Sequence, residues 1–179
     1  CFSVSSATRP VHTTLFTGLY PFEHGVVSQR TPRMQPGLAN LFDLLAKAGF
    51  QVAGFSQAVQ VFAGLDYARW IRPFDEESVR QALFSPGQRS VFLHYWETHT
   101  PYGAVDGKAM GATAALLRQG RRAEVIAAYQ RAVIGVFERH IAPLLSELPL
   151  DQWMVLICGD HGESWTDQEL YHGQTLDNS

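Results

Sequence analysis

Among its 179 residues the chain has only two cysteines, Cys1 and Cys158, and it has no long apolar run. Because Cys158 lies inside an apolar segment, we expect no structural disulfide, and the cysteines leave the cellular compartment undetermined. No run approaches the ~20 apolar residues of a membrane-spanning helix, and no basic-then-apolar signal peptide is visible. The 14 basic and 17 acidic residues form no nucleic-acid-binding pattern. We therefore expect neither nucleic acid nor a membrane segment in this piece, and the localisation stays unknown.

The sequence also lacks internal repeats, and its apolar runs alternate with amphipathic segments. Strands are expected at residues 51–55, 90–95 and 153–158, and the apolar spacing predicts helices near residues 38–45 and 125–144. Residues 63–86 are interpreted as an irregular surface excursion. Strands that alternate with helices in this order predict an α/β fold, a mostly parallel sheet flanked by helices, in a single domain.

The most informative segment is the apolar run Trp153 to Cys158, which is followed at once by Gly159, Asp160 and His161. The run suits a buried strand, and in open α/β sheets ligands bind just beyond the carboxyl ends of strands. A carboxylate and an imidazole together suit zinc, manganese or iron, and calcium less readily. The alternative is a turn that simply ends a strand.

A second segment begins with small hydroxyl residues, continues through Pro10 and ends at Gly18. Proline is favoured in the first turn of a helix and glycine just past its end, so Thr8 is expected at or just before a helix N-terminus. That position favours a bound anion. Thr8 is then either an ordinary helix cap or a nucleophile whose hydroxyl pKa is lowered by a bound metal.

Several motifs in one order now point to a family. They are Thr8-Arg-Pro-Val-His12 with Thr17-Gly18, Pro21 and His24-Gly25; the helix and strand of residues 35–55; His99-Thr-Pro101-Tyr102; Asp160-His161-Gly162-Glu163; and Tyr171-His172-Gly173. Together they resemble the sulfatase and alkaline-phosphatase superfamily over nearly the whole chain. The resemblance implies an alkaline-phosphatase-like fold and one or two divalent metal ions, manganese, zinc or calcium.

The resemblance also implies roles for individual residues. Thr8 is expected to be the nucleophile and a metal ligand, and His99 to bind a substrate oxygen or protonate the leaving group. The remaining metal ligands are expected to be Asp160, His161 and His172. Arg9 and His12 flank the nucleophile, so either is expected to contact charged oxygens of the substrate. The other histidines are interpreted mainly as structural: His94 within a strand, His140 on the long helix, and His24, whose match fits support or active site equally.

Position 8 separates branches of this family. Sulfatases carry a cysteine or serine there, which becomes formylglycine, and an arginine four residues later; this chain has Thr8 and His12. Threonine cannot yield that aldehyde. The resemblance therefore implies phosphorus chemistry: a phosphodiesterase, phosphonate hydrolase, or phosphoglycerol or phosphoethanolamine transferase that forms a phospho-threonine intermediate. The expected substrate is a small-molecule, glycan or lipid head-group ester. Two alternatives stay open, a sulfuric ester hydrolase and a catalytically inactive relative that acts as a binding module.

The first residue, Cys1, has two interpretations, a fragment of a longer chain or a mature lipoprotein with a lipid-bearing cysteine. We favour the fragment, because only a few residues separate Cys1 from Thr8 and leave no tether. The family has an earlier strand that ends in one or two metal-binding aspartates, and it continues its sheet beyond the position of Ser179. The resemblance thus implies a catalytic domain that is incomplete at both ends.

Overall fold

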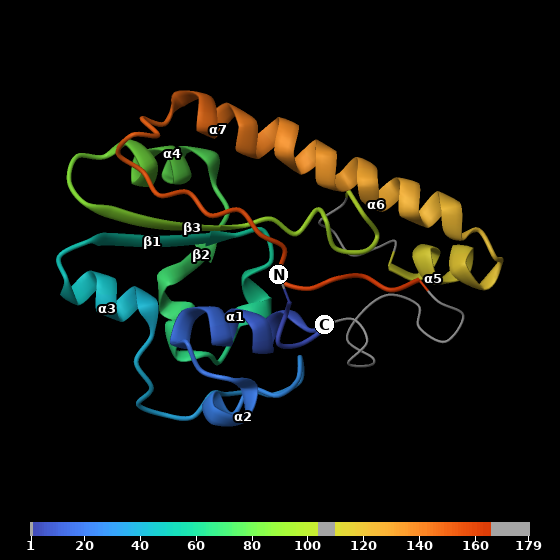
Figure 1. Ribbon diagram of the computed structural model, residues 1–179, viewed down its shortest axis with the longest axis horizontal. Coiled ribbons are helices and arrows are strands. Elements are labelled where there is room, and N and C mark those ends of the chain that lie inside the picture. Colours follow the sequence, from blue (N-terminus) through green and yellow to red (C-terminus); the bar gives the residue numbers. More distant parts are fainter. Residues whose placement is uncertain (1, 104–109, 166–179) are drawn as a thin grey trace. The chain divides into compact units, whose positions relative to one another are not determined.

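The structure is a computed structural model that describes residues 2–103 and 110–165. Contacts divide the chain into two compact units. Of the described residues, the first unit contains 2–94 and 159–163, and the second contains 95–103, 110–158 and 164–165. Each unit is described below by itself. Figure 1 gives the order of the elements along the chain.

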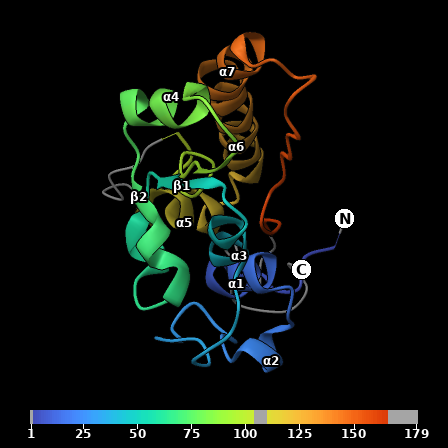
Figure 2. The ribbon, with the colours of Figure 1, turned by 90° about the vertical axis from the view of Figure 1, so that its left-hand side faces the viewer.

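The first unit is built on a parallel sheet of three strands, β1 (Gln51–Ser56), β2 (Ile71–Pro73) and β3 (Arg89–His94), in the order β2-β1-β3. Ser56 is paired with His94 across β1 and β3, so both residues lie at the carboxyl edge of the sheet. Figure 2 shows α4 (Glu76–Phe84) on one face of the sheet, with α1 (Thr8–Thr17) and α3 (Leu41–Lys47) on the other. The expected α/β class with a parallel sheet is confirmed.

Helix α1 begins and ends where the sequence predicts. Pro10 lies in its first turn, and Gly18 closes it in the left-handed conformation, with φ of 72°. The N-cap is Ala7, which offers no side-chain cap. The interpretation of Thr8 as an ordinary helix cap is therefore wrong. A short helix, α2 (Pro21–His24), follows directly.

An aromatic cluster forms the core between α1 and the sheet. The ring of Phe16 lies 4.5 Å from that of Phe42, 4.9 Å from Tyr67 and 5.0 Å from Phe92. Tilted and edge-on aromatic pairs of this kind add specific attraction to the burial of apolar area. The cluster fixes the helix that carries Thr8 against the strand that ends in His94.

The expectation of an irregular excursion at residues 63–86 is wrong. This stretch contains β2, α4 and a short 3₁₀ helix, η2 (Asp66–Trp70), which follows the 3₁₀ helix η1 (Val59–Phe62). The Asp75 side chain caps α4 by accepting a hydrogen bond from the amide of Ser78, and Val79 and Leu83 are buried. Aspartate before a stripe spaced by four residues is a helix signal, and the nearby aromatic and proline residues obscured it.

The second unit contains α5 (Met110–Arg118), α6 (Arg122–Val136), η3 (Phe137–Ile141) and α7 (Ala142–Glu147). The last three are consecutive, which matches the expected long helix. Segment η3 is a π turn that ends at Ile141, two residues before Pro143. Proline lacks an amide proton and its ring crowds the carbonyl four residues earlier, and a wider turn at this point relieves that conflict. Among the residues the structure describes, no helix is both long and apolar enough to span a membrane.

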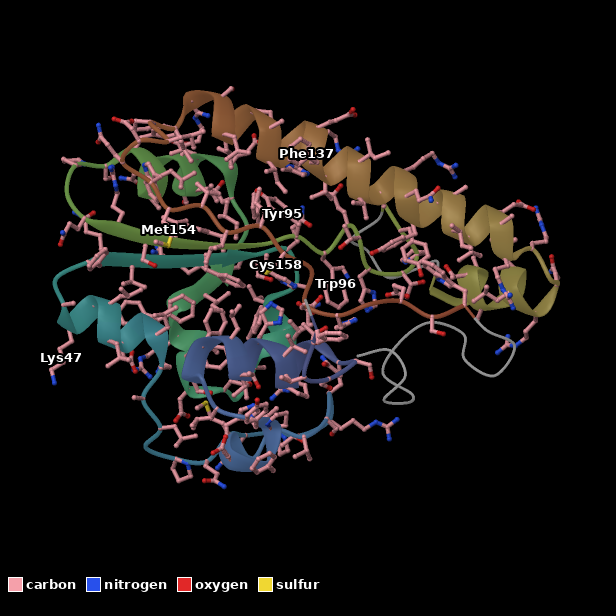
Figure 3. All side chains as sticks on the ribbon, viewed as in Figure 1. Lys47, Tyr95, Trp96, Phe137, Met154 and Cys158 are labelled. Atoms are coloured by element: carbon pink, nitrogen blue, oxygen red, sulfur yellow. The ribbon has the colours of Figure 1, made fainter. Side chains whose placement is uncertain are left out.

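The expected buried strand at residues 153–158 is wrong. The run has no regular secondary structure. Met154 is 86% and Leu156 85% exposed, and Cys158 is exposed as well; Figure 3 labels Met154 and Cys158. An apolar run becomes a strand only when a neighbouring strand supplies a hydrogen-bonded ladder, and within the described residues this run has none.

Candidate functional site

Two segments that are far apart in the sequence meet at the N-terminus of α1. Thr8 is buried, and its Oγ1 lies 3.4 Å from Nε2 of His161. Nε2 of His161 lies 3.4 Å from Oδ2 of Asp160. Nδ1 of His12, one turn along α1, lies 3.8 Å from the same carboxylate oxygen. The first unit thus brings together Thr8, His12, Asp160 and His161, as the sequence predicts for the centre of the site.

The hydrogen bonds of His161 fix which ring nitrogen is basic. Its Nδ1 lies 3.0 Å from the carbonyl oxygen of Gly162. A carbonyl only accepts, so Nδ1 carries the proton and the lone pair of the neutral ring is on Nε2. The Thr8 hydroxyl is placed to donate to this lone pair, and Oδ2 of Asp160 lies 3.4 Å from the same nitrogen.

Three donor atoms that could hold a metal ion lie close together. The separations from Nε2 of His161 to Thr8 Oγ1 and to Asp160 Oδ2 are both 3.4 Å. Among the described residues, however, no group of three or more histidine, cysteine, aspartate or glutamate side chains is placed to hold a metal ion. The described chain supplies two such ligands and one hydroxyl, which leaves the coordination sphere open.

The charge of Asp160 is stabilised by its neighbours. Burial by itself would raise the pKa of Asp160, but His161, His12 and His94 and the amide of His161 outweigh burial and lower it. The Asp160 side chain therefore stays anionic at neutral pH, as a ligand for a hard cation must be.

His12 is held neutral inside the core. Burial lowers its pKa most strongly, and Asp160 only partly compensates. Its Nδ1 donates to the carbonyl oxygen of Thr8 at 2.9 Å, and its ring lies edge-on to Phe62 at 5.2 Å and to His94 at 5.2 Å. These contacts make His12 a rigid support beside Thr8, and its role as a substrate ligand stays a prediction.

Arg9 has a different environment from the one the sequence suggests. Its Nη1 donates to the carbonyl oxygens of Val61 and Ala63 at 3.0 Å each, and its Nη2 donates to that of Pro32 at 3.3 Å. The side chain is buried. These bonds use the guanidinium to anchor loops, so the structure gives no support to a substrate contact by Arg9.

The helix N-terminus offers an anion fewer donors than expected. The amide of Arg9 donates to Oε1 of Gln29 at 3.0 Å, Pro10 has no amide proton, and the amide of Val11 bonds to the carbonyl of Ala7. An incoming anion at this helix end would therefore depend mainly on the macrodipole and on a bound cation.

Two contributors were not identified from the sequence. Ser3 Oγ shares its proton between the carbonyl oxygens of Asp160 at 2.7 Å and Ser5 at 2.8 Å, and the first contact ties the N-terminal segment to the loop of Asp160 and His161. The sequence predicts that His94 is a hydrogen-bonded core residue within a strand. It does bond Ser56, at 2.7 Å, but it also acts electrostatically on Asp160. The position of His94 at the carboxyl end of a parallel strand is a sequence signal for a part in the site. The sequence contains no such signal for Ser3.

The remaining histidines are His24, His99, His140 and His172. His24 is fully buried; its Nδ1 accepts from the amide of Val26, so its Nε2 donates to Thr14 Oγ1 at 3.0 Å, a structural role. His99 and His140 belong to the second unit. His172 lies outside the described residues.

We compared the chain with protein-family models, with curated proteins and with solved structures, and none of them matches it. The site therefore has to be interpreted from its own geometry and chemistry.

Proposed function

We propose that this chain carries the nucleophile of a metal-dependent hydrolase or transferase of phosphate esters, with an alkaline-phosphatase-like arrangement, and that Thr8 forms the covalent intermediate. The observation that carries the proposal is the 3.4 Å separation between Thr8 Oγ1 and His161 Nε2. It is supported by the site's position at the carboxyl edge of a parallel sheet, where α/β proteins bind ligands.

Asp160, His161 and Thr8 are the described residues that would hold the metal, and His172 is the further ligand expected from the sequence. When bound, a divalent ion supplies charge that lowers the hydroxyl pKa of Thr8 and neutralises the nonbridging oxygens of the ester. Asp160 remains anionic and His161 presents Nε2, so both meet the protonation state that a ligand requires.

The chain's own residues then take part in two displacement steps at phosphorus. Thr8 loses its hydroxyl proton to solvent, and its Oγ1 forms a bond to phosphorus as the bond to the leaving alcohol breaks. His99, the acid expected from the resemblance, would give the departing oxygen the Nε2 proton of its doubly protonated ring and become neutral. Water, or an acceptor alcohol in a transferase, then attacks phosphorus and gives its proton to His99, while the Oγ1–phosphorus bond breaks and Thr8 takes up a proton from solvent. The rigid aromatic cluster under α1 keeps Oγ1 in place throughout.

One finding favours a second candidate, a catalytically inactive relative that binds ligands without turnover. The described residues supply only two of the usual metal-ligating side chains, Asp160 and His161. With this pair alone, metal binding would be weak.

The test is metal-dependent hydrolysis of an aryl phosphodiester and of an aryl sulfate by the full-length protein. Phosphodiester turnover that a chelator abolishes supports the proposal, sulfate turnover alone indicates a sulfuric ester hydrolase, and no turnover of either indicates the binding relative. Thr8→Ala should lower turnover by at least ~10³-fold. The control is Thr17→Ala at the other end of α1, where the hydroxyl bonds only the local backbone.

A further inference from the structure

The loop at residues 95–103 follows β3 along the chain and belongs to the second unit. Several hydrogen bonds fix its backbone. The amide of His99 donates to the carbonyl of Trp96, that of Tyr102 to His99, and that of Gly103 to Glu97. Tyr102 has a positive φ of 62°, which is uncommon outside glycine and persists only where the surroundings enforce it. Figure 3 labels Trp96 in this loop.

The ring of His99 is held on two sides. It stacks on Trp96 at 3.8 Å between ring centres, with 15° between the planes. Its Nδ1 lies 2.8 Å from the carbonyl oxygen of Thr100. Since a carbonyl only accepts, Nδ1 carries the proton and Nε2 carries the lone pair of the neutral ring.

The same loop contains a buried carboxylate that is bound by the long helix. Glu97 is 9% exposed. Its Oε1 lies 2.7 Å from Nε2 of His140, and its Oε2 accepts from Nη2 of Arg139. Arg139 and His140 are adjacent in the π turn η3, and the ring of His140 stacks on Tyr95 at 5.1 Å. A buried carboxylate needs such partners, so these contacts fasten the loop at its start.

We propose that Glu97 is a positioning residue for His99: its carboxylate, held by Arg139 and His140, fixes the loop from Trp96 to Gly103 so that His99 keeps its proton on Nδ1 and uses Nε2 in proton transfer. The proton-transfer part rests on the proposed function. The positioning part rests only on contacts within the second unit.

The first test reads the tautomer of His99 by NMR of the ¹⁵N-histidine-labelled full chain at a pH where the ring is neutral. The native protein and the control Arg131→Ala, an exposed arginine on α6, should show His99 protonated on Nδ1. In Glu97→Gln, the Nε2-protonated form should appear beside it. Arg139→Ala removes a half-exposed side chain and should give the same result even where Glu97→Gln fails to fold. Native tautomers in both variants, or an equal change in Arg131→Ala, would overturn the proposal.

The second test uses ester turnover. Arg139→Ala should lower kcat by about tenfold or more, within the range that proton transfer contributes, and should alter the pH profile more than KM. Combined with His99→Ala, it should add no further loss, because both act through one group. Independent, multiplying losses would contradict positioning. If the native protein turns over no ester, the proposed function fails, while the tautomer measurement still decides the role of Glu97.

Discussion

Thr8 Oγ1 lies 3.4 Å from Nε2 of His161, although 153 positions separate the two residues in the sequence. Helix α1 carries Thr8, and the loop after residue 158 carries His161. Other contacts within each of these two segments fix its position. A hydroxyl, a basic ring nitrogen and an anionic carboxylate lie together here, and these are the groups to which the proposed function assigns a cation and a nucleophile.

Replacement of Asp160 tests the cation site separately from catalysis. Asp160→Asn keeps the size of the side chain but removes the charge that a hard cation requires. We expect the affinity for Mn²⁺ or Zn²⁺ to fall by at least about 10- to 100-fold, by calorimetry with the metal alone. Asp151→Asn, an exposed aspartate in the second unit, should bind like the native protein. Equal affinities for all three proteins would remove Asp160 from the site.

Ser3 contacts the Asp160 carbonyl, so we expect its replacement to lower metal affinity by less than replacement of Asp160 does. Ser3→Ala removes the 2.7 Å hydrogen bond and leaves both metal-ligating side chains intact. Supporting hydrogen bonds of this kind orient ligands, so metal affinity should fall by about tenfold. The same calorimetric titration measures it. An unchanged affinity would show that the loop of Asp160 and His161 is positioned without Ser3.

His24 predicts how stability depends on pH. Burial lowers its pKa below the ordinary 6.5, so the folded protein takes up this proton less readily than the unfolded chain. The stability that neutral His24 contributes is therefore fully present above pH 6.5 and is lost as pH falls from 6.5 toward the lowered pKa. Urea unfolding of the native protein and of His24→Gln should show a difference in free energy that shrinks over this interval. A constant difference between them would contradict the account.

Two leucines distinguish the observed exposure of residues 153–158 from the expected buried strand. Leu156 is 85% exposed, so Leu156→Ala should change the free energy of unfolding by no more than about 0.5 kcal/mol. Leu83, which is 5% exposed on α4, is the matched control, and Leu83→Ala should cost about 2–5 kcal/mol. Chemical denaturation measures both. A loss at Leu156 as large as that at Leu83 would show that the run is buried after all.

The sequence predicts most of the local structure around the site. Pro10 and Gly18 mark the first helix correctly, and the apolar runs at β1 and β3 give two parallel strands, because their signals are local. The predicted strand at residues 153–158 is wrong because its formation does not depend on local signals alone. Burial of an apolar run depends on a partner strand, and no local pattern reveals whether that partner is present.

Residue types and flanking motifs in the sequence point to Thr8, Asp160 and His161. The structure brings these three residues together, and their metal-binding and catalytic roles stay predictions. The sequence suggests a substrate contact for Arg9 because it is charged and lies beside Thr8, whereas its donors reach loop carbonyls whose positions depend on tertiary structure. The sequence does not reveal the role of Ser3, because Ser3 acts through a backbone contact with Asp160.

The central claim is that Thr8 becomes covalently bonded to phosphorus. The most direct measurement incubates the full-length protein with metal and an aryl phosphodiester, quenches it in acid during turnover, and analyses the peptide that contains Thr8 by mass spectrometry. The account predicts a phosphoryl adduct on Thr8, abolished by Thr8→Val and by chelator and unaffected by Thr17→Val. Turnover without any adduct in the native protein, or an adduct that persists on another residue in Thr8→Val, would contradict it.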